Sequence, residues 1–298
     1  MGWPSSTPIA DEVVNLGDGR VVSYAEWGQP DGRPVVFVNG CPGSRLMCPD
    51  VEETVAAGVR LLTIDRPGYG WSSPLPGRRV VDWVADFVEW ADLIGLPPCP
   101  VVGWSIGGQF ALALAARCPA RVTSVGVAAG HAPLDELHDG WGSLSDETRA
   151  YVESLRGDPF AGVEATRIRC GWFEDWESVF EPNWATDGEQ PESVNPDDRL
   201  KEHDEILQPL REQVREAARQ GTAGVIADSI ASWLPWGFSL SEVARPVHLW
   251  WGDGDALVPR ADTECLADGI QGSMLTTLPG EGHLFPVTHW RQMLAALA

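Results

Sequence analysis

The chain has 298 residues, of which 44% are apolar and 21% are charged, a composition typical of globular proteins with a full hydrophobic core. This composition excludes the disordered and fibrous classes. The 43 acidic residues outnumber the 21 basic ones and give a formal net charge of −22, so a nucleic acid would be repelled and is not an expected partner.

The sequence carries no signal for secretion, membrane insertion or cofactor binding. The first residues, MGWPSSTPIADEVV, lack the basic and apolar regions of a signal peptide, and no apolar run reaches about 18 residues, so we expect a cytoplasmic protein without a membrane partner. The six cysteines lack metal-binding spacing, and no nucleotide or calcium motif occurs, so we expect free thiols, no metal and no cofactor. The expected partner is a small-molecule substrate, and the oligomeric state is left open.

Short β-rich runs alternate with helical stretches in the first part of the chain. Five such runs predict strands, at residues 13–16, 20–27, 34–38, 59–64 and 98–104. The first two flank a GDG turn and predict a hairpin, whereas residues 80–95 carry apolar side chains at helical spacing. Nearly all-apolar strands that alternate with helices predict a parallel sheet covered on both faces.

This regularity is interrupted between residues 132 and 240. The segment is rich in Trp, Asp and Glu and predicts one long helix at residues 204–220. We interpret residues 132–240 as a mostly helical cap or lid insertion, which divides a core formed by residues 1–131 and 241–298. After the insertion the alternation resumes, with strands predicted at 245–252 and 273–278 and helices at 259–269 and near 289–297.

The stretch GWSIGG, residues 103–108, follows the strand predicted at 98–104 and precedes the helical run FALALAAR. Small residues two positions before and after Ser105 leave room for a sharp strand-to-helix turn, with the serine at its apex in a strained conformation. The N-terminus of the following helix supplies free N–H groups and positive potential where negative charge would develop.

This G-x-S-x-G pattern is the nucleophile elbow of the α/β-hydrolases, and the chain resembles that superfamily over nearly its whole length. The resemblance implies an α/β fold with a mostly parallel eight-stranded sheet flanked by helices and a helical cap insertion. It also implies that a base and an orienting carboxylate activate the serine, in the chain order Ser, acid, His.

Two later loops supply candidates for the acid and the base. GDGDALVP resembles the acid loop of the superfamily, where Asp255 takes the position of the acid, and Asp253 is the alternative in the same turn. The base is expected in LPGEGHLFP as His283, whereas His289 falls within the predicted last helix. The predicted catalytic triad is therefore Ser105, Asp255 and His283.

The oxyanion hole needs two backbone donors, one of them from the residue after the nucleophile, Ile106. The other is expected from the loop NGCPGSR, which resembles the HGxPGS loop of many family members and nominates the N–H of Cys41. The family usually has His where this chain has Asn39, and an asparagine can still brace the loop. We interpret Cys41 itself as a small residue at a tight turn rather than as a nucleophile, and Asp65 and Arg66 as structural.

Aromatic residues near the nucleophile and in the insertion predict an apolar pocket. Trp104, Trp172 and Trp176 are the predicted substrate-binding residues, with Phe173, Phe180 and Trp184 as further candidates. The predicted function is therefore a serine hydrolase that cleaves a carboxylic ester or lactone of a neutral, apolar small molecule through an acyl-enzyme on Ser105.

Three alternatives stay open at this point. The first is an aminopeptidase of the proline-iminopeptidase kind, in which Glu174, Asp175 or Glu177 binds the substrate ammonium, although GWSIGG lacks the GGSWG form usual in those enzymes. The others are a non-hydrolytic enzyme on the same scaffold and a non-catalytic small-molecule binding protein, because fold does not determine reaction.

Overall fold

A computed structural model describes residues 7–180 and 195–298, and its central element is an eight-stranded sheet. The strands follow the order β1-β2-β4-β3-β5-β6-β7-β8. Their bounds are β1 Ala10–Asn15, β2 Val21–Gly28, β3 Arg33–Val38, β4 Val59–Ile64, β5 Cys99–Trp104, β6 Val122–Ala128, β7 Val247–Gly252 and β8 Met274–Leu278.

The predicted mostly parallel sheet is confirmed. β1 and β2 form the predicted antiparallel hairpin, β2 also pairs antiparallel with β4, and all other neighbours are parallel. The strand β6 was not predicted separately, and the short helix α1 (Val51–Ala56) was not predicted at all. Because the carboxyl ends of parallel strands meet at one edge, the loops after β3, β5, β7 and β8 gather there.

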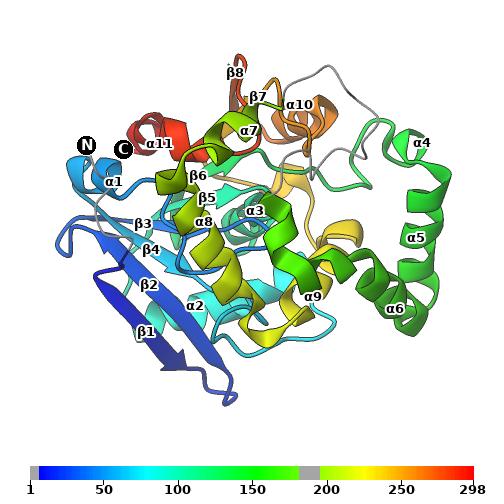
Figure 1. Ribbon diagram of the computed structural model, residues 1–298, viewed down its shortest axis with the longest axis horizontal. Helices are drawn as coiled ribbons and strands as arrows, with labels where there is room; N and C mark the ends of the chain where they lie inside the picture. The colour runs from blue at the N-terminus through cyan, green and yellow to red at the C-terminus, as the bar shows by residue number, and fades with distance from the viewer. Residues whose placement is uncertain (1–6, 181–194) are drawn as a thin grey trace.

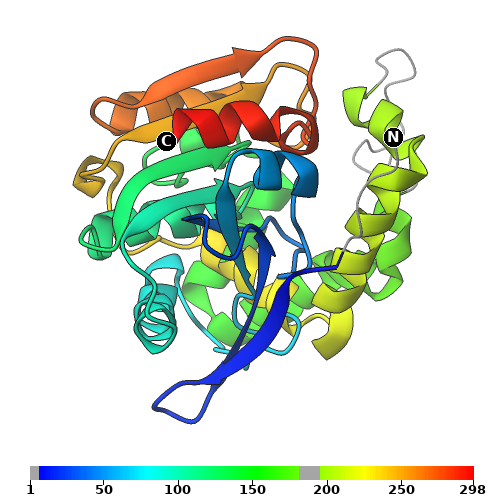
Figure 2. The same ribbon diagram turned by 90° about the vertical axis from the view of Figure 1, so that its left-hand side faces the viewer.

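Successive side chains along each central strand point alternately into two hydrophobic layers, one on each face of the sheet. In β3, Val36 and Val38 belong to the layer beneath the helices α2 (Trp83–Leu93), α3 (Gly107–Arg117) and α10 (Arg260–Gly269). Val35 and Phe37 belong to the opposite layer, which α1 and α11 (Pro286–Ala296) cover, as Figures 1 and 2 show. Period-two alternation thus explains why the central strands are apolar throughout.

The segment between β6 and β7 is mostly helical in its described residues. Its elements are α4 Gly140–Ser143, α5 Asp146–Gly157, α6 Pro159–Arg169, η2 Gly171–Phe180, α7 Pro196–Lys201, α8 Asp204–Ala217, η3 Ala218–Gln220, α9 Ala223–Trp233 and η4 Leu240–Glu242. The helix predicted at residues 204–220 corresponds to α8 and η3, and that predicted at 80–95 corresponds to η1 (Val80–Asp82) and α2. The exact division into core and cap stays a prediction.

The insertion is held to the core at the carboxyl edge of the sheet. Ser44, in the loop after β3, donates its side-chain hydroxyl to the carbonyl of Gln213 on α8 (2.7 Å) and its N–H to the Gln213 side chain (3.1 Å). Figure 1 shows α7 and α8 crossing in front of the sheet. The loop after β3 and α8 are therefore joined directly at this edge.

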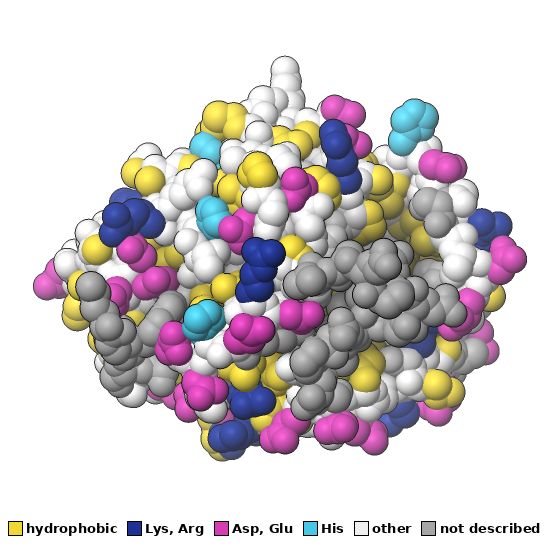
Figure 3. Space-filling view, turned by 45° about the horizontal axis from the view of Figure 1, so that its top comes forward, with side chains coloured by type: hydrophobic (Ala, Val, Ile, Leu, Met, Phe, Trp, Pro, Cys, Tyr) yellow, Lys and Arg dark blue, Asp and Glu magenta, His cyan; other side chains and the backbone are white. Residues whose placement is uncertain are grey.

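The surface is acidic without one dominant patch on the face that Figure 3 presents, where Asp and Glu side chains are scattered among uncharged atoms. Within residues 7–180 and 195–298, no helix is both long and apolar enough to cross a membrane. The predicted cellular location stays a prediction.

Candidate active site

Ser105 occupies the sharp turn between β5 and α3 with a φ of 55°, a region that residues other than glycine rarely adopt. The turn is held because Ser105 N–H donates to the Ala128 carbonyl (2.8 Å). A Cβ at Gly103 would lie 2.3 Å from the Gly107 carbonyl oxygen, and one at Gly107 would lie 2.0 Å from the Val38 oxygen. The glycines are therefore required for the close approach that presents the serine hydroxyl.

The structure brings Asp255 and His283 together, although 28 residues separate them in the sequence. Nδ1 of His283 lies 2.9 Å from Oδ2 of Asp255, and both side chains are buried. The other oxygen of Asp255 accepts from the N–H groups of Leu257 (2.8 Å) and Val258 (3.0 Å). Asp253 instead accepts from Gly280 N–H (2.6 Å), so it braces the neighbouring turn and does not contact the imidazole.

Each partner of this pair favours the charged form of the other. Burial raises the pKa of Asp255, but the charge and hydrogen bond of His283 and the two N–H groups outweigh burial and leave this pKa below its ordinary value. Burial lowers the pKa of His283, but the charge and hydrogen bond of Asp255 and the charge of Asp197 outweigh it and raise this pKa. The pair is therefore suited to hold an imidazolium that forms transiently.

Trp104 connects the elbow to the loop that carries His283. Its indole N–H donates to the His283 carbonyl (3.1 Å), and the two rings lie 5.7 Å apart between centroids. Because Trp104 immediately precedes Ser105, this contact ties the loop that carries His283 to the elbow. The indole is buried in the core, and its predicted contact with substrate stays a prediction.

The loop after β3 lies against the elbow, as an oxyanion hole requires. A Cβ at Gly40 would lie 3.2 Å from the Cβ of Ser105 and 3.8 Å from its Oγ. Asn39 donates its side-chain amide to the Ser44 carbonyl (2.6 Å), so asparagine braces this loop in place of the usual histidine. Among the described residues, none accepts a hydrogen bond from the backbone N–H of Cys41 or Ile106, the two predicted donors.

The thiol of Cys41 is not suited to act as a nucleophile. Burial, followed by the charge of Asp228, raises its pKa to about 12, so it stays protonated at neutral pH. Tyr69 donates its hydroxyl to the sulfur (3.2 Å). These contacts agree with the interpretation of Cys41 as a small residue in the loop.

Arg66 holds the loop after β3 through hydrogen bonds to its backbone. Its guanidinium donates to the carbonyls of Asn39 and Gly40, the latter at 2.7 Å. It also pairs with Asp228 on α9 at 2.6 Å, and Arg78 pairs with the second oxygen of that carboxylate. All three charged side chains are almost completely buried, so this network joins the loop after β3 to the insertion.

We expect Asp228→Ala to lower the free energy of unfolding by about 3–5 kcal/mol, because it leaves two buried guanidinium groups without their carboxylate. Urea unfolding followed by circular dichroism measures this loss. Asp92→Ala is the matched control, since its pair with Arg121 is exposed and should change stability by less than about 1 kcal/mol. Equal losses in the two variants would contradict the structural role of Asp228.

A cleft of about 1110 Å³ opens beside the elbow, between α9, α10 and the segment after β6. Ile106, which follows Ser105, and Leu257, two residues after Asp255, both line it, whereas Ser105, Asp255 and His283 are not among its lining residues. The rest of its apolar lining includes Leu134, Leu144 and Trp233. This volume accommodates a small-molecule ligand.

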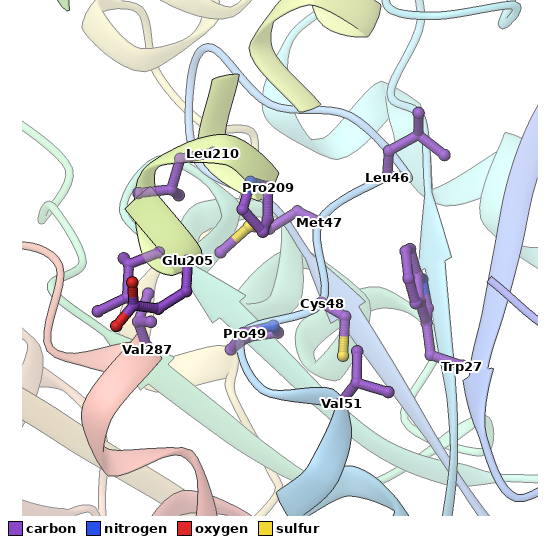
Figure 4. A pocket seen from close by; sticks show the side chains of 11 residues that line it. Trp27, Leu46, Met47, Cys48, Pro49, Val51, Glu205, Pro209, Leu210 and Val287 are labelled. Carbon is purple, nitrogen blue, oxygen red and sulfur yellow. The ribbon is translucent and has the colours of Figure 1, made fainter. Parts of the chain in front are cut away.

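A second hollow, between α8 and the loop of residues 46–49, does not serve this purpose. Figure 4 shows Pro209 and Leu210 of α8 facing Met47 and Cys48 across it. Its volume is about 30 Å³, close to that of one water molecule. Its lining includes no residue of the elbow, of the acid loop or of the loop that carries His283.

The predicted pocket residues of the insertion lie near the oxyanion loop rather than in the large cleft. Trp172 and Trp176 pack on a hydrophobic cluster that also contacts Cys41, and Phe173 is buried within it. Phe180 packs on the same cluster. Trp184 lies outside the described residues. The substrate-binding role of these aromatic side chains stays a prediction.

Sequence reasoning missed two buried carboxylates at this site. Asp228 is the single charged residue in the mostly apolar helix AGVIADSIASW, a signal that could have indicated a buried ion pair. Asp197 accepts from the N–H groups of His283 and Leu284, both at 2.9 Å, but in the sequence it is one of two adjacent aspartates in the run NPDD, and no pattern singles it out.

Comparison with known proteins agrees with this architecture. The family described as the alpha/beta hydrolase fold matches residues 33–168. The chain is 33% identical over 144 residues to the pimeloyl-acyl-carrier protein methyl ester esterase of Nitrosospira multiformis, covering 47% of this chain and 54% of that protein. It is 30% identical over 133 residues to the proline iminopeptidase of Xylella fastidiosa, covering 41% and 40%. The chain thus spans about half or less of the length of these two relatives.

The likeness in three dimensions extends over the whole chain. The crystal structure of a bromoperoxidase from Bacillus anthracis superimposes with a TM-score of 0.68 and 22% identity, covering 97% of this chain and 98% of that one. At this identity the likeness shows the fold alone. Together with the family match over β3 to α6, it shows that the chain has the α/β-hydrolase fold.

Proposed function

We propose that this protein hydrolyses a carboxylic ester or lactone of a neutral, apolar small molecule through an acyl-enzyme on Ser105. The observation that carries the proposal is the buried Asp255–His283 pair, which is linked through Trp104 to the elbow of Ser105. An alcohol activated by an imidazole and a carboxylate is the arrangement that acyl transfer requires.

In the first half of the reaction, Oγ of Ser105 attacks the carbonyl carbon while Nε2 of His283 accepts the hydroxyl proton. The N–H groups of Cys41 and Ile106 stabilise the negative oxygen of the tetrahedral intermediate, each contributing on the order of 3 kcal/mol. The C–O bond to the leaving group then breaks, and His283 transfers its proton to the departing alkoxide. The products are an alcohol and an acyl-enzyme.

In the second half, His283 removes a proton from water, whose oxygen attacks the acyl carbon. The second tetrahedral intermediate collapses as the bond to Oγ breaks, and His283 returns the proton to Ser105. A carboxylic acid leaves, and the resting enzyme is restored. Asp255 holds Nδ1–H throughout, so that Nε2 faces the serine in both halves.

The lining of the large cleft supports an apolar substrate without negative charge. Ile106, Leu257 and Trp233 offer apolar surface close to the elbow. The lining also includes the carboxylates Glu136 and Asp262, which disfavour an anionic acyl group.

The peptidase alternative has less support. Glu174, Asp175 and Glu177, its predicted ammonium-binding carboxylates, are all exposed on η2, so none lies in a closed site for a substrate amine. One aligned relative is named an esterase and another an iminopeptidase, so the names alone do not decide between them.

We expect the purified protein to release nitrophenol from short neutral acyl esters and to cleave amino-acid anilides far more slowly. Esters of an acyl chain that ends in a carboxylate serve as the matched control, and their kcat/KM should be lower because of the acidic cleft. Faster cleavage of the anilides would favour the peptidase. No ester cleavage and no labelling by a fluorophosphonate would contradict the proposal and favour a binding protein.

A further inference from the structure

The carboxylate of Asp197 lies against the loop that carries His283, although it comes from helix α7 of the insertion. Its Oδ2 accepts from the N–H of His283 and its Oδ1 accepts from the N–H of Leu284, both at 2.9 Å. The residue is 6% exposed. Both carboxylate oxygens therefore accept hydrogen bonds from the backbone of the loop that carries the imidazole.

Two glycines allow α7 to approach this closely. A Cβ at Gly282 would lie 2.2 Å from Oδ1 of Asp197, and a Cβ at Gly254 would lie 2.7 Å from Cγ of Pro196. The N–H of Gly254 also donates to the Glu281 carbonyl (2.9 Å), which ties the acid loop to the base loop. The start of α7 thus rests on both loops of the Asp255–His283 pair.

Two carboxylates act on the charge of His283. Asp255 reaches Nδ1 from the loop after β7, and Asp197 acts from α7 through the backbone side. The other carboxylates of these loops are turned elsewhere, because Asp253 accepts from Gly280 and Glu281 faces His289 at 3.9 Å. Burial opposes the positive charge on His283, and the charges of Asp255 and Asp197 outweigh it and raise the pKa of His283.

We propose that Asp197 is a positioning residue that fixes the backbone of His283 and stabilises its imidazolium through space. The inference rests on the proposed function, in which His283 is the base. Asp255, which contacts Nδ1, determines the tautomer of His283. Asp197 contacts only the backbone and determines the position of the imidazole ring. The insertion thereby contributes to the chemistry as well as to the walls of the cleft.

The test is Asp197→Asn, which keeps the size of the side chain, removes its charge and places an amide group against a backbone N–H. We expect kcat/KM to fall by about tenfold to a hundredfold, mainly through kcat, because a small displacement of a catalytic group has effects of this order. The acid limb of the pH profile should also move to lower pH, since an imidazolium with fewer negative neighbours loses its proton more readily. Glu202 is exposed at the end of α7, so Glu202→Gln is the matched control. It should leave kcat/KM and the acid limb of the pH profile unchanged.

A second readout does not depend on turnover. In protein labelled with ¹³C at histidine Cε1, the signal of His283 is assigned by its absence in His283→Gln and titrated by NMR. Its pKa should be lower in Asp197→Asn than in the wild type. A loss of activity without a change in this titration would mean a purely structural contact and would overturn the proposal. If the wild type cleaves no ester, the proposed function fails, and the titration still tests Asp197.

Gly282→Ala provides a second variant, in which the charge of Asp197 is retained. Its new methyl group overlaps Oδ1 of Asp197, so it should displace the carboxylate and lower kcat/KM. In the Asp197→Ala background this overlap is absent, and the same change should have a smaller effect. Additive losses in this double-mutant cycle would contradict the role of Asp197.

Discussion

Ser105→Ala is expected to lower kcat for ester hydrolysis on the order of a million-fold, because removing a triad nucleophile leaves only the binding contacts and the oxyanion donors. The substitution removes one hydroxyl at the apex of the elbow, and alanine experiences the same backbone strain there as serine, so the fold should persist. Steady-state rates with nitrophenyl esters measure the loss. Labelling by a fluorophosphonate should disappear in parallel.

Ser241→Ala is the control for this experiment, since Ser241 is exposed and far from the elbow in sequence. It should retain wild-type turnover and labelling. Labelling that persists in Ser105→Ala would place the nucleophile elsewhere and refute the proposed mechanism.

Asp255→Asn is expected to lower kcat about ten-thousand-fold, the loss seen when the carboxylate of such a triad becomes an amide. The amide still fills the site, but its NH₂ group favours the wrong tautomer of His283 and it carries no charge to stabilise the imidazolium. The measurement is kcat across the pH range, with circular dichroism to show that the variant is folded.

Asp253→Asn is the matched control in the same turn. The exposed side chain of Asp253 accepts a hydrogen bond from the N–H of Gly280, and such a contact contributes about 1 kcal/mol. The loss of this hydrogen bond should therefore change kcat by less than about tenfold. A larger loss in Asp253→Asn than in Asp255→Asn would reverse the assignment of the acid.

Local patterns in the sequence were enough to predict the strands of the sheet and the elbow at Ser105. Apolar runs at strand length predicted β3, β4 and β5, and the glycines of GWSIGG predicted the turn at which Ser105 has a φ of 55°. These features are decided within a few residues, by side-chain periodicity and by the space that a tight turn requires. β6 was not predicted as a separate strand, although it lies inside the sheet between β5 and β7.

The sequence favoured Asp255 as the acid on its position in the motif, and Asp253 was the alternative because both residues stand in one turn with the same chemistry. Tertiary structure distinguishes them, since only Asp255 is directed at His283 while Asp253 braces the turn beside it. The catalytic roles of Ser105, Asp255 and His283 stay predictions, to which the variants above give a direct answer.

The sequence by itself thus determined the parallel sheet, the strained serine and the chain order of the candidate groups. Only the tertiary structure decided which buried carboxylates support them: Asp228 pairs with Arg66 across 162 residues, and Asp197 meets the backbone of His283 across 86. Such contacts form because packing removes water from groups that are distant in the chain, and a buried charge is then stable only beside its partner.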